Sequence, residues 1–333
     1  MKQKKLLVIH QGALGDVISA CPAILELKRK YARIDVLCQG QVGRLMQYLN
    51  IATRAYPLES AAFATLFSDC PESRVKHVIK SYDAILLLSF SSGLEENLKR
   101  ITRNPVHRIP PRPAPEKRLR VTRYLLDRLK PIGLIDTIDK NEASSLRAIN
   151  RAVIQAETSK PYRIIIHPGS GSPKKNWPLP LFIEVGRRLK SMAMKPEFIL
   201  GPAEYHLLDE LNRISGEVRI IDDLIVLAEE LVKSAGFVGN DSGVSHLSAF
   251  LGLPTVVIFG PSDPKRWAPK GTSVRIIGPD TEGLECNPCF EKPDVLCATR
   301  ECMINLSPTR VLNALIEMID EKRSIENFRS IIV

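Results

Sequence analysis

Short apolar runs alternate with helical patterns in two stretches of the chain, and this alternation constrains the fold more than any other feature. In the first stretch we expect strands near residues 6–9, 34–38, 84–88 and 107–109. In the second we expect strands near residues 163–166, 198–200, 237–238, 255–259 and 274–277, with helices at 181–190, 203–214, 224–234 and 242–251. Repeated strand–helix alternation predicts parallel sheets with helices on both faces.

A polar stretch that begins near Pro131 and ends near Pro161 separates the two halves. The chain has 333 residues, which is more than one hydrophobic core usually supports. We therefore predict an α/β protein with two domains, residues 1–155 and 156–310, followed by a C-terminal helix and tail at 311–333. Ligands of such sheets bind beyond the carboxyl ends of the strands.

Two loops of the second half suit the oxygens of a phosphate group. The loop at 167–178 is rich in Gly and Ser and carries Ser170, Ser172 and Lys175. The loop at 239–246 opens a helix, so its backbone amides lie at the positive helix end, an anion site. Its candidate residues are Asp241, Ser242, Gly243, Val244 and His246. The alternatives are an ordinary Gly/Pro-rich loop and a capped helix start, and capping is compatible with anion binding.

Two shorter turns carry an acidic residue each. Glu204 follows the expected strand at 198–200, where a carboxylate can accept hydrogen bonds from ribose hydroxyls. Asp16 follows the turn Gly12-Ala13-Leu14-Gly15 after the first strand and stands at a helix start. In both cases the simpler interpretation is a carboxylate that caps its helix.

The net charge of +10 is concentrated in one segment. Between Lys99 and Lys130 there are eleven lysines and arginines and two acidic residues, which gives +9. Such a segment attracts nucleic acid, an acidic membrane surface or an acidic sugar, unless it is a solvated basic helix. Tyr124 is its only aromatic residue, so it offers few stacking platforms for nucleic acid.

Metal and membrane signals are weak. Cys286 and Cys289 have the Cys-x2-Cys spacing of a zinc site, but the spacing of Cys297 and Cys302 is unusual for one, so the four residues are either a zinc site or a loop of reduced thiols. The seven cysteines fit a reducing compartment better than a disulfide framework. Asp-x-Asp, which many sugar transferases use to hold a metal-bound diphosphate, does not occur in the sequence. The first apolar run is too short for a signal peptide, and no run is long enough for a membrane helix, so we expect a cytoplasmic protein.

Taken in order, these motifs resemble the heptosyltransferases, the glycosyltransferases that build the inner core of bacterial lipopolysaccharide. The resemblance rests on Gly15-Asp16-Val17, on the 167–178 loop ending in Trp177-Pro178, on the 201–204 turn, and on the 240–246 and 260–264 segments. It extends over about residues 4–310. The residue before Lys175 is basic, and the one after it, where the family often has a basic residue or His, is Asn176.

The resemblance implies a GT-B fold, with two Rossmann-like domains facing across a central cleft and the C-terminal helix packing back toward the first domain. The first domain would bind the acceptor and the second the nucleotide sugar. The resemblance also implies that heptose is transferred from ADP-heptose to an anionic glycolipid at the inner face of the cytoplasmic membrane. This transfer would invert the anomeric configuration and would need neither a metal nor a cofactor.

Carried onto this sequence, the family roles make Asp16 the general base and Lys175 a phosphate contact. The 241–246 segment would hold the diphosphate, and Glu204 the ribose. For the acceptor we predict Gly15 and the arginines Arg100, Arg103, Arg108, Arg120 and Arg123. The alternatives are a GT-B transferase for another nucleotide sugar, a nucleotide-sugar epimerase on the same fold, and a nucleic-acid-binding protein.

Overall fold

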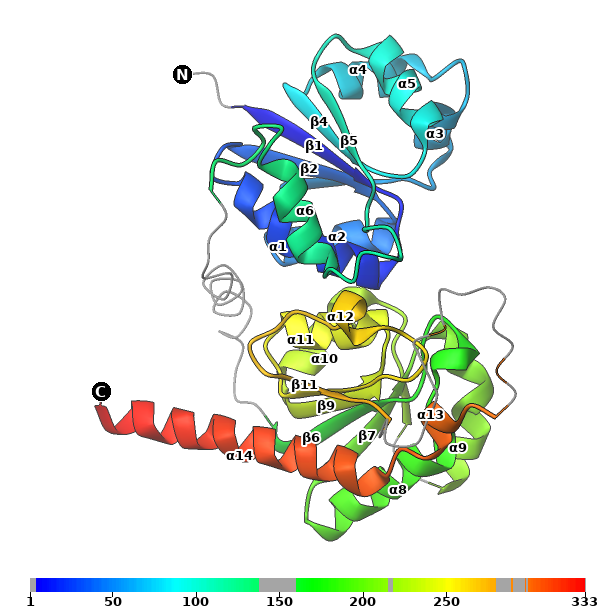
Figure 1. Cartoon of the computed structure of the whole chain (residues 1–333), viewed down its shortest axis with the longest axis vertical. Helices are drawn as coiled ribbons and strands as arrows, with labels where there is room; N and C mark the ends of the chain where they lie inside the picture. Colours follow the sequence, from blue (N-terminus) through cyan, green and yellow to red (C-terminus); the bar gives the residue numbers. More distant parts are fainter. Residues whose placement is uncertain are drawn as a thin grey trace. The chain divides into compact units, whose positions relative to one another are not determined.

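The structure is a computed structural model that describes residues 4–137, 160–214, 218–279, 289, 297 and 299–332. The chain divides into two compact units, Met1–Ser145 and Leu146–Val333, and Figure 1 shows the sheet and helices of each. The predicted boundary between residues 155 and 156 lies outside the described residues.

The first unit is a parallel five-stranded sheet between two layers of helices. Its strands are β1 (Lys5–His10), β2 (Arg33–Cys38), β3 (Arg54–Pro57), β4 (Ala84–Leu88) and β5 (Val106–Ile109), and their order is β3-β2-β1-β4-β5. The helices are α1 (Leu14–Leu27), α2 (Gly40–Tyr48), α3 (Ala61–Ala64), α4 (Ser73–Lys80), α5 (Ser92–Ile101) and α6 (Val121–Leu129), with a short 3-10 helix, η1 (Thr65–Phe67). In Figure 1, α1 and α6 cover one face of the sheet, and α3, α4 and α5 cover the other.

The second unit is a parallel six-stranded sheet. Its strands are β6 (Lys160–His167), β7 (Lys195–Leu200), β8 (Val218–Ile220), β9 (Ser234–Asn240), β10 (Thr255–Ile258) and β11 (Val274–Ile277), in the order β11-β10-β9-β6-β7-β8. Between them lie α8 (Leu179–Ser191), α9 (Leu208–Ile214), α10 (Leu224–Val232), α11 (Gly243–Phe250) and α12 (Pro264–Trp267), with η2 (Pro173–Lys175) and η3 (Pro202–Leu207). Two helices follow the last strand, α13 (Glu301–Ile304) and α14 (Pro308–Ile332).

Helix α14 begins three residues before the predicted C-terminal segment. Its apolar side chains join the core of the second unit: Val311, Leu312, Leu315, Met318 and Ile319 are buried together with residues of β6, β9 and β10. The long helix beneath the second sheet in Figure 1 is α14. The described part of this helix is therefore part of the second unit, and its predicted packing toward the first domain stays a prediction.

The registers of the sheets set where the candidate site lies. In the second sheet His167 pairs with Gly239, and Ile258 pairs with Asn240, so β6, β9 and β10 end at one level. In the first sheet, Leu88 of β4 pairs with His10 of β1 and with Ile109 of β5. The loops that follow these strands therefore emerge side by side at the carboxyl edge of each sheet.

Candidate functional site

Asn240 ties two of the predicted loops together at the carboxyl edge of the second sheet. It is the last residue of β9 and is completely buried. The backbone N–H of Trp177 donates a hydrogen bond of 2.9 Å to its side-chain oxygen, and its amide nitrogen donates one of 2.7 Å to the carbonyl of Pro168. Asn240 thus holds both ends of the 167–178 loop. We predicted no such role for it, because a buried amide that binds backbone looks in sequence like any loop asparagine.

Glu204 lies against the same loop. Its Oε2 accepts a hydrogen bond of 3.0 Å from the Gly201 N–H and lies 3.7 Å from Nε2 of His167. A Cβ atom at Gly169 would lie 2.0 Å from Oε1, so any larger residue there would displace the Glu204 side chain. The capping role considered for Glu204 is therefore confirmed, and its contact with a ribose stays a prediction.

The electrostatics around Glu204 keep it ionised. Burial raises the pKa of this carboxyl, but the neighbouring His167 and the N–H of Gly201, together with His206, lower it further than burial raises it. The pKa of Glu204 therefore lies below its ordinary value. The 201–204 turn contributes a fixed negative charge beside the 167–178 loop.

Lys175 and Asp241 form an ion pair between the two loops. Nζ of Lys175 lies 3.2 Å from Oδ2 of Asp241, and only 15% and 8% of these two side chains are exposed. Nε2 of His246 lies 4.0 Å from the other oxygen of Asp241. Asp241 is negatively charged and would repel a diphosphate, so its role is to hold Lys175 and His246 in place. Those two basic side chains are better suited than Asp241 to contact a diphosphate.

The start of α11 presents backbone donors next to this ion pair. Ser242 is the N-cap, and its hydroxyl accepts a hydrogen bond from the N–H of Ser245, so the predicted capping is confirmed. Within the described residues, the first-turn N–H groups of Gly243 and Val244 have no acceptor. These two groups lie at the positive end of the helix dipole, where an anion is stabilised.

The two serines of the 167–178 loop differ in their surroundings. The hydroxyl of Ser170 lies 2.8 Å from the carbonyl of Ser172 and 2.6 Å from the side-chain oxygen of Asn176, so it shapes the loop. The hydroxyl of Ser172 makes no hydrogen bond to the part of the chain that the structure describes. Ser172 is thus the better placed of the two to bind a ligand.

Asp16 lies at the carboxyl edge of the first sheet and is half-buried. It is the third residue of α1, and the N–H of Ala13 donates a hydrogen bond of 3.3 Å to its Oδ2. The capping role is therefore confirmed here too, while catalysis by Asp16 stays a prediction. Gly15 precedes it in the same turn, and its carbonyl accepts a hydrogen bond of 2.8 Å from the Ser19 hydroxyl.

His10 is a neighbour of Asp16 that we did not predict. A Cβ atom at Gly12 would lie 2.6 Å from both the His10 ring and Cβ of Asp16, so glycine lets the two residues approach. The Gly12 N–H donates a hydrogen bond of 2.9 Å to Nδ1 of His10. Burial lowers the pKa of His10 to about 4, although the charge of Asp16 raises it. The ring beside Asp16 is therefore neutral near neutral pH.

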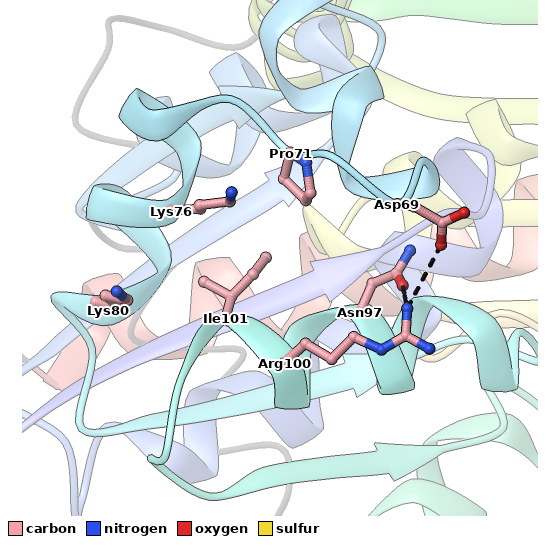
Figure 2. A pocket seen from close by; sticks show the side chains of 7 residues that line it. All are labelled: Asp69, Pro71, Lys76, Lys80, Asn97, Arg100 and Ile101. Atoms are coloured by element: carbon pink, nitrogen blue, oxygen red, sulfur yellow. Dashed lines mark hydrogen bonds and ion pairs between the residues drawn. The ribbon is translucent and has the colours of Figure 1, made fainter.

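Two of the predicted acceptor arginines lie at the opposite edge of the first sheet from Asp16. Arg100 is in the last turn of α5, and Arg103 follows that helix before β5 begins. Arg100 lines a pocket of about 310 Å³ together with Lys76, Lys80, Asn97, Ile101, Asp69 and Pro71. Figure 2 shows Arg100 pointing toward Asp69 and Asn97, to which it is bonded at 3.4 and 3.3 Å.

The other three predicted arginines lie in different surroundings. Arg108 on β5 is bonded to Glu95 of α5, and Arg123 pairs with Asp127 at 3.0 Å. Arg120 is the exposed N-cap of α6, and two residues later the Thr122 hydroxyl bonds the carbonyl of Ser19 in α1. The start of α6, which carries Arg120 and Arg123, therefore packs against α1 near Ser19.

The described residues contain no group of three or more His, Cys, Asp and Glu side chains that could hold a metal ion. Cys286 of the cysteine cluster lies outside the described residues, while Cys289, Cys297 and Cys302 form no disulfide bond within the described part of the chain. Among the described helices, none combines the length and the apolar character needed to cross a membrane.

Solved structures show the same fold over nearly the whole chain. A glycosyl transferase family 9 protein from Veillonella parvula superimposes with a TM-score of 0.74 at 17% identity, covering 96% of this chain and 98% of that one. The Escherichia coli ADP-heptose LPS heptosyltransferase II superimposes with a TM-score of 0.66 at 18% identity, covering 96% and 99%. The chain thus has the GT-B fold of two Rossmann-like domains, as predicted from the sequence.

The family follows from the sequence comparison. The model of glycosyltransferase family 9 (heptosyltransferase) matches residues 113–299, more than half of the chain, and the chain belongs to this family. It is 26% identical over 180 residues to lipopolysaccharide heptosyltransferase 1 of Pseudomonas aeruginosa, and 30% identical over 157 residues to lipooligosaccharide heptosyltransferase 2 of Campylobacter jejuni. These matches cover 49% and 44% of this chain and 50% and 48% of the relatives, so the chain spans about half their length.

Proposed function

We propose that this protein transfers a heptose from ADP-heptose to an inner-core lipopolysaccharide acceptor, with inversion and without a metal. The observation that carries the proposal is that Asp241, which directly precedes the N-cap of α11, holds Lys175 at the same sheet edge as the first-turn amides of that helix. Family membership supplies the sugar and the acceptor class, since the matched relatives are named as lipopolysaccharide and lipooligosaccharide heptosyltransferases.

The donor half of the mechanism concerns the leaving diphosphate. Negative charge builds on its β-phosphate oxygen as the bond to the sugar breaks, and fixed donors aimed at that charge lower the barrier. Lys175 would supply a cation, and Gly243 and Val244 would supply backbone N–H groups. Before the diphosphate binds, Asp241 would hold Lys175 in place through their ion pair. After it binds, Lys175 would contact both Asp241 and the diphosphate.

The acceptor half concerns one proton. In a single displacement with inversion, a base removes the proton from the attacking hydroxyl, and we assign that role to Asp16. A cationic neighbour would weaken a carboxylate base. The low pKa of His10 supports the assignment, because its ring is neutral under working conditions and leaves the carboxylate free to take the proton.

The location of the protein follows from its acceptor. We infer that it works at the inner face of the cytoplasmic membrane and is held there peripherally by an anionic glycolipid. The basic segment between Lys99 and Lys130 supports this inference through its net charge of +9.

The test of Asp16 is a transfer assay on Asp16→Asn with ADP-heptose and a purified inner-core acceptor. The rate should fall by about 10² to 10⁴, because that is the usual worth of a general base. Binding of ADP, measured by thermal shift, should stay unchanged. Asp127→Asn is the matched control, since it removes a half-exposed carboxylate of a surface ion pair on α6. Near-normal turnover of Asp16→Asn would refute the assignment.

A second test addresses the donor site. Lys175→Ala should lower ADP affinity roughly tenfold or more, as expected for a charge-assisted contact of 1.5–3 kcal/mol. Lys195→Ala is the control, because Lys195 is exposed at the opposite end of the sheet. A thermal-shift screen of ADP, UDP and GDP then tests the nucleotide, and a preference for UDP or GDP would refute the ADP-sugar donor. Conversion of the donor without any acceptor would point instead to an epimerase.

A further inference from the structure

The pocket between α4 and α5 of the first unit collects three basic side chains. It has a volume of about 310 Å³. Lys76 and Lys80 line it from α4, and Arg100 lines it from the last turn of α5. In Figure 2 the two lysines come from one helix, and Arg100 comes from the helix beside it. The transfer chemistry proposed above uses none of these side chains except Arg100, which we predicted as an acceptor contact.

The protein itself neutralises these cations poorly. Lys76 and Lys80 are four residues apart on one helix, so they lie on the same face, where like charges repel each other. Within the described part of the chain, neither lysine has a hydrogen bond or an ion pair. Asp69 pairs with Arg100 at 3.4 Å, but both side chains are mostly exposed, so this ion pair adds little. The pocket therefore holds three cations against one carboxylate and is suited to an anion.

An exposed aromatic ring is fixed next to the same pocket. The side-chain nitrogen of Asn97, which lines the pocket, donates hydrogen bonds of 3.0 and 3.2 Å to the carbonyls of Leu66 and Ser68. Phe67 lies between these two residues and is 48% exposed, whereas Leu66 is completely buried in the core. The segment is therefore held in place with the Phe67 ring exposed, two residues before Asp69 of the pocket.

A fixed exposed ring beside unpaired cations fits a lipid surface better than a soluble anion. A single exposed hydrophobic residue is common and needs no function by itself. A free phosphate would contact the cations but would gain nothing from Phe67. At a bilayer, by contrast, aromatic rings are favourable at the level of the headgroups, and lysines are attracted to anionic lipids. The ring and the cations together therefore favour the phosphate of a lipid headgroup.

We propose that the pocket between α4 and α5 binds the phosphate of an anionic phospholipid and docks the first unit on the membrane, with the Phe67 ring among the headgroups. Lys76, Lys80 and Arg100 surround the phosphate. The last turns of both helices lie at the opposite edge of the sheet from Asp16, so this lipid is a docking ligand and not the sugar acceptor. The proposal rests on the proposed function only in taking the bilayer as the source of the phosphate.

Vesicle sedimentation of the full chain, without donor or acceptor, tests the docking site separately from transfer. The vesicles contain either phosphatidylcholine alone or phosphatidylcholine mixed with anionic phosphatidylglycerol. The wild type should bind the mixed vesicles and lose that binding at high salt, where charges are screened. Lys76→Gln combined with Lys80→Gln should weaken the binding about thirtyfold, because each lysine at an anionic surface contributes about fivefold. Phe67→Ser should weaken it about fivefold, because about half of the ring is exposed in the protein and would leave water.

Two control variants match these changes. Lys195→Gln combined with Arg213→Gln removes two exposed cations of the second unit, and so lowers the net charge by the same amount. Phe90→Ser removes a ring that is 58% exposed and follows β4 at the other edge of the first sheet. Both controls should bind the mixed vesicles as the wild type does.

Several outcomes would overturn the docking site. They are equal binding of the wild type to both kinds of vesicle, no binding to either, unchanged binding by the double lysine variant, and an equal loss in the double control, which would make net charge alone responsible. Thermal stabilisation by inorganic phosphate without vesicle binding would indicate a soluble anion and would overturn the bilayer as the source. If the docking site is confirmed and no heptose is transferred, the proposed function alone fails.

Discussion

Removal of the Asn240 side chain tests how the donor site is held together. In Asn240→Ala, the N–H of Trp177 and the carbonyl of Pro168 lose their partners at 2.9 and 2.7 Å in a completely buried position. Each buried group left without a partner costs about 1–3 kcal/mol, so we expect the free energy of unfolding of the second unit to fall by about 3 kcal/mol. ADP binding should weaken as well, because Asn240 holds both ends of the 167–178 loop.

The positions of the tryptophans allow the unfolding of the second unit to be measured separately. Its two tryptophans, Trp177 and Trp267, both lie in the second unit, so urea unfolding followed by tryptophan fluorescence reports on that unit alone. This matters because a two-unit chain need not unfold in one step. Asn305→Ala is the control, since Asn305 is exposed, and surface changes of this kind usually stay within about 0.5 kcal/mol.

A variant of the same size separates hydrogen bonding from packing. Asn240→Asp keeps the acceptor for the Trp177 N–H but places an oxygen, in place of the donor, against the carbonyl oxygen of Pro168. The free energy of unfolding of Asn240→Asp should therefore fall by at least as much as that of Asn240→Ala, although Asn240→Asp makes no cavity. A loss below about 1 kcal/mol in both variants would refute the inference that Asn240 holds the loop.

Three further changes have defined outcomes. His10 is protonated only near pH 4 in the folded state but near pH 6.5 in the unfolded state, so its contribution to the free energy of unfolding should fall by about 3 kcal/mol as the pH drops from 6.5 to 4. Urea titration at several pH values should show that His10→Gln removes this part of the pH dependence. Gly169→Ala should abolish ADP binding in thermal shift, since the added Cβ would lie 2.0 Å from Oε1 of Glu204; normal binding would show that Glu204 can move away. Arg163→Leu should destabilise the second unit by about 3–5 kcal/mol, because it removes the buried cation that pairs with Glu197 at 2.8 Å and with Glu230. The folded variant should bind ADP normally. An unchanged urea midpoint would contradict the expected loss of stability.

The strands that the sequence predicted are those with apolar runs. All nine expected strands are present. Seven of them are largely buried apolar runs, whereas the edge strands β5 and β11 are mostly half-buried but still carry the Val and Ile residues that predicted them. The structure adds β3 (Arg54–Pro57) and β8 (Val218–Ile220), which were not predicted. Both are short edge strands whose residues are exposed or half-buried, so neither has the pattern of a buried strand.

The sequence predicted which loops form the candidate site, but not which residues contact each other within those loops. Glycine-rich turns after apolar runs indicated the carboxyl edges of the sheets, and the structure places the 167–178 and 239–246 loops together there. Partners within those loops were not predictable, because the contacts of Asn240 with Trp177 and of Glu204 with Gly169 depend on strand register. For the same reason, the charge count between Lys99 and Lys130 could not separate Arg120, at the start of a helix that packs on α1, from Arg100, which lines a pocket at the other edge of the sheet.

The most direct test of the proposed function is the product of one incubation. The full chain is mixed with ADP-heptose and an inner-core acceptor without added metal and with a chelator, and the product is analysed by mass spectrometry and by NMR of the new linkage. We predict an acceptor that is heavier by one heptose, with the anomeric configuration inverted relative to the donor, and no such product from Asp16→Asn. An unmodified acceptor, a linkage with retained configuration, or transfer only when metal replaces the chelator would contradict the mechanism proposed for this protein.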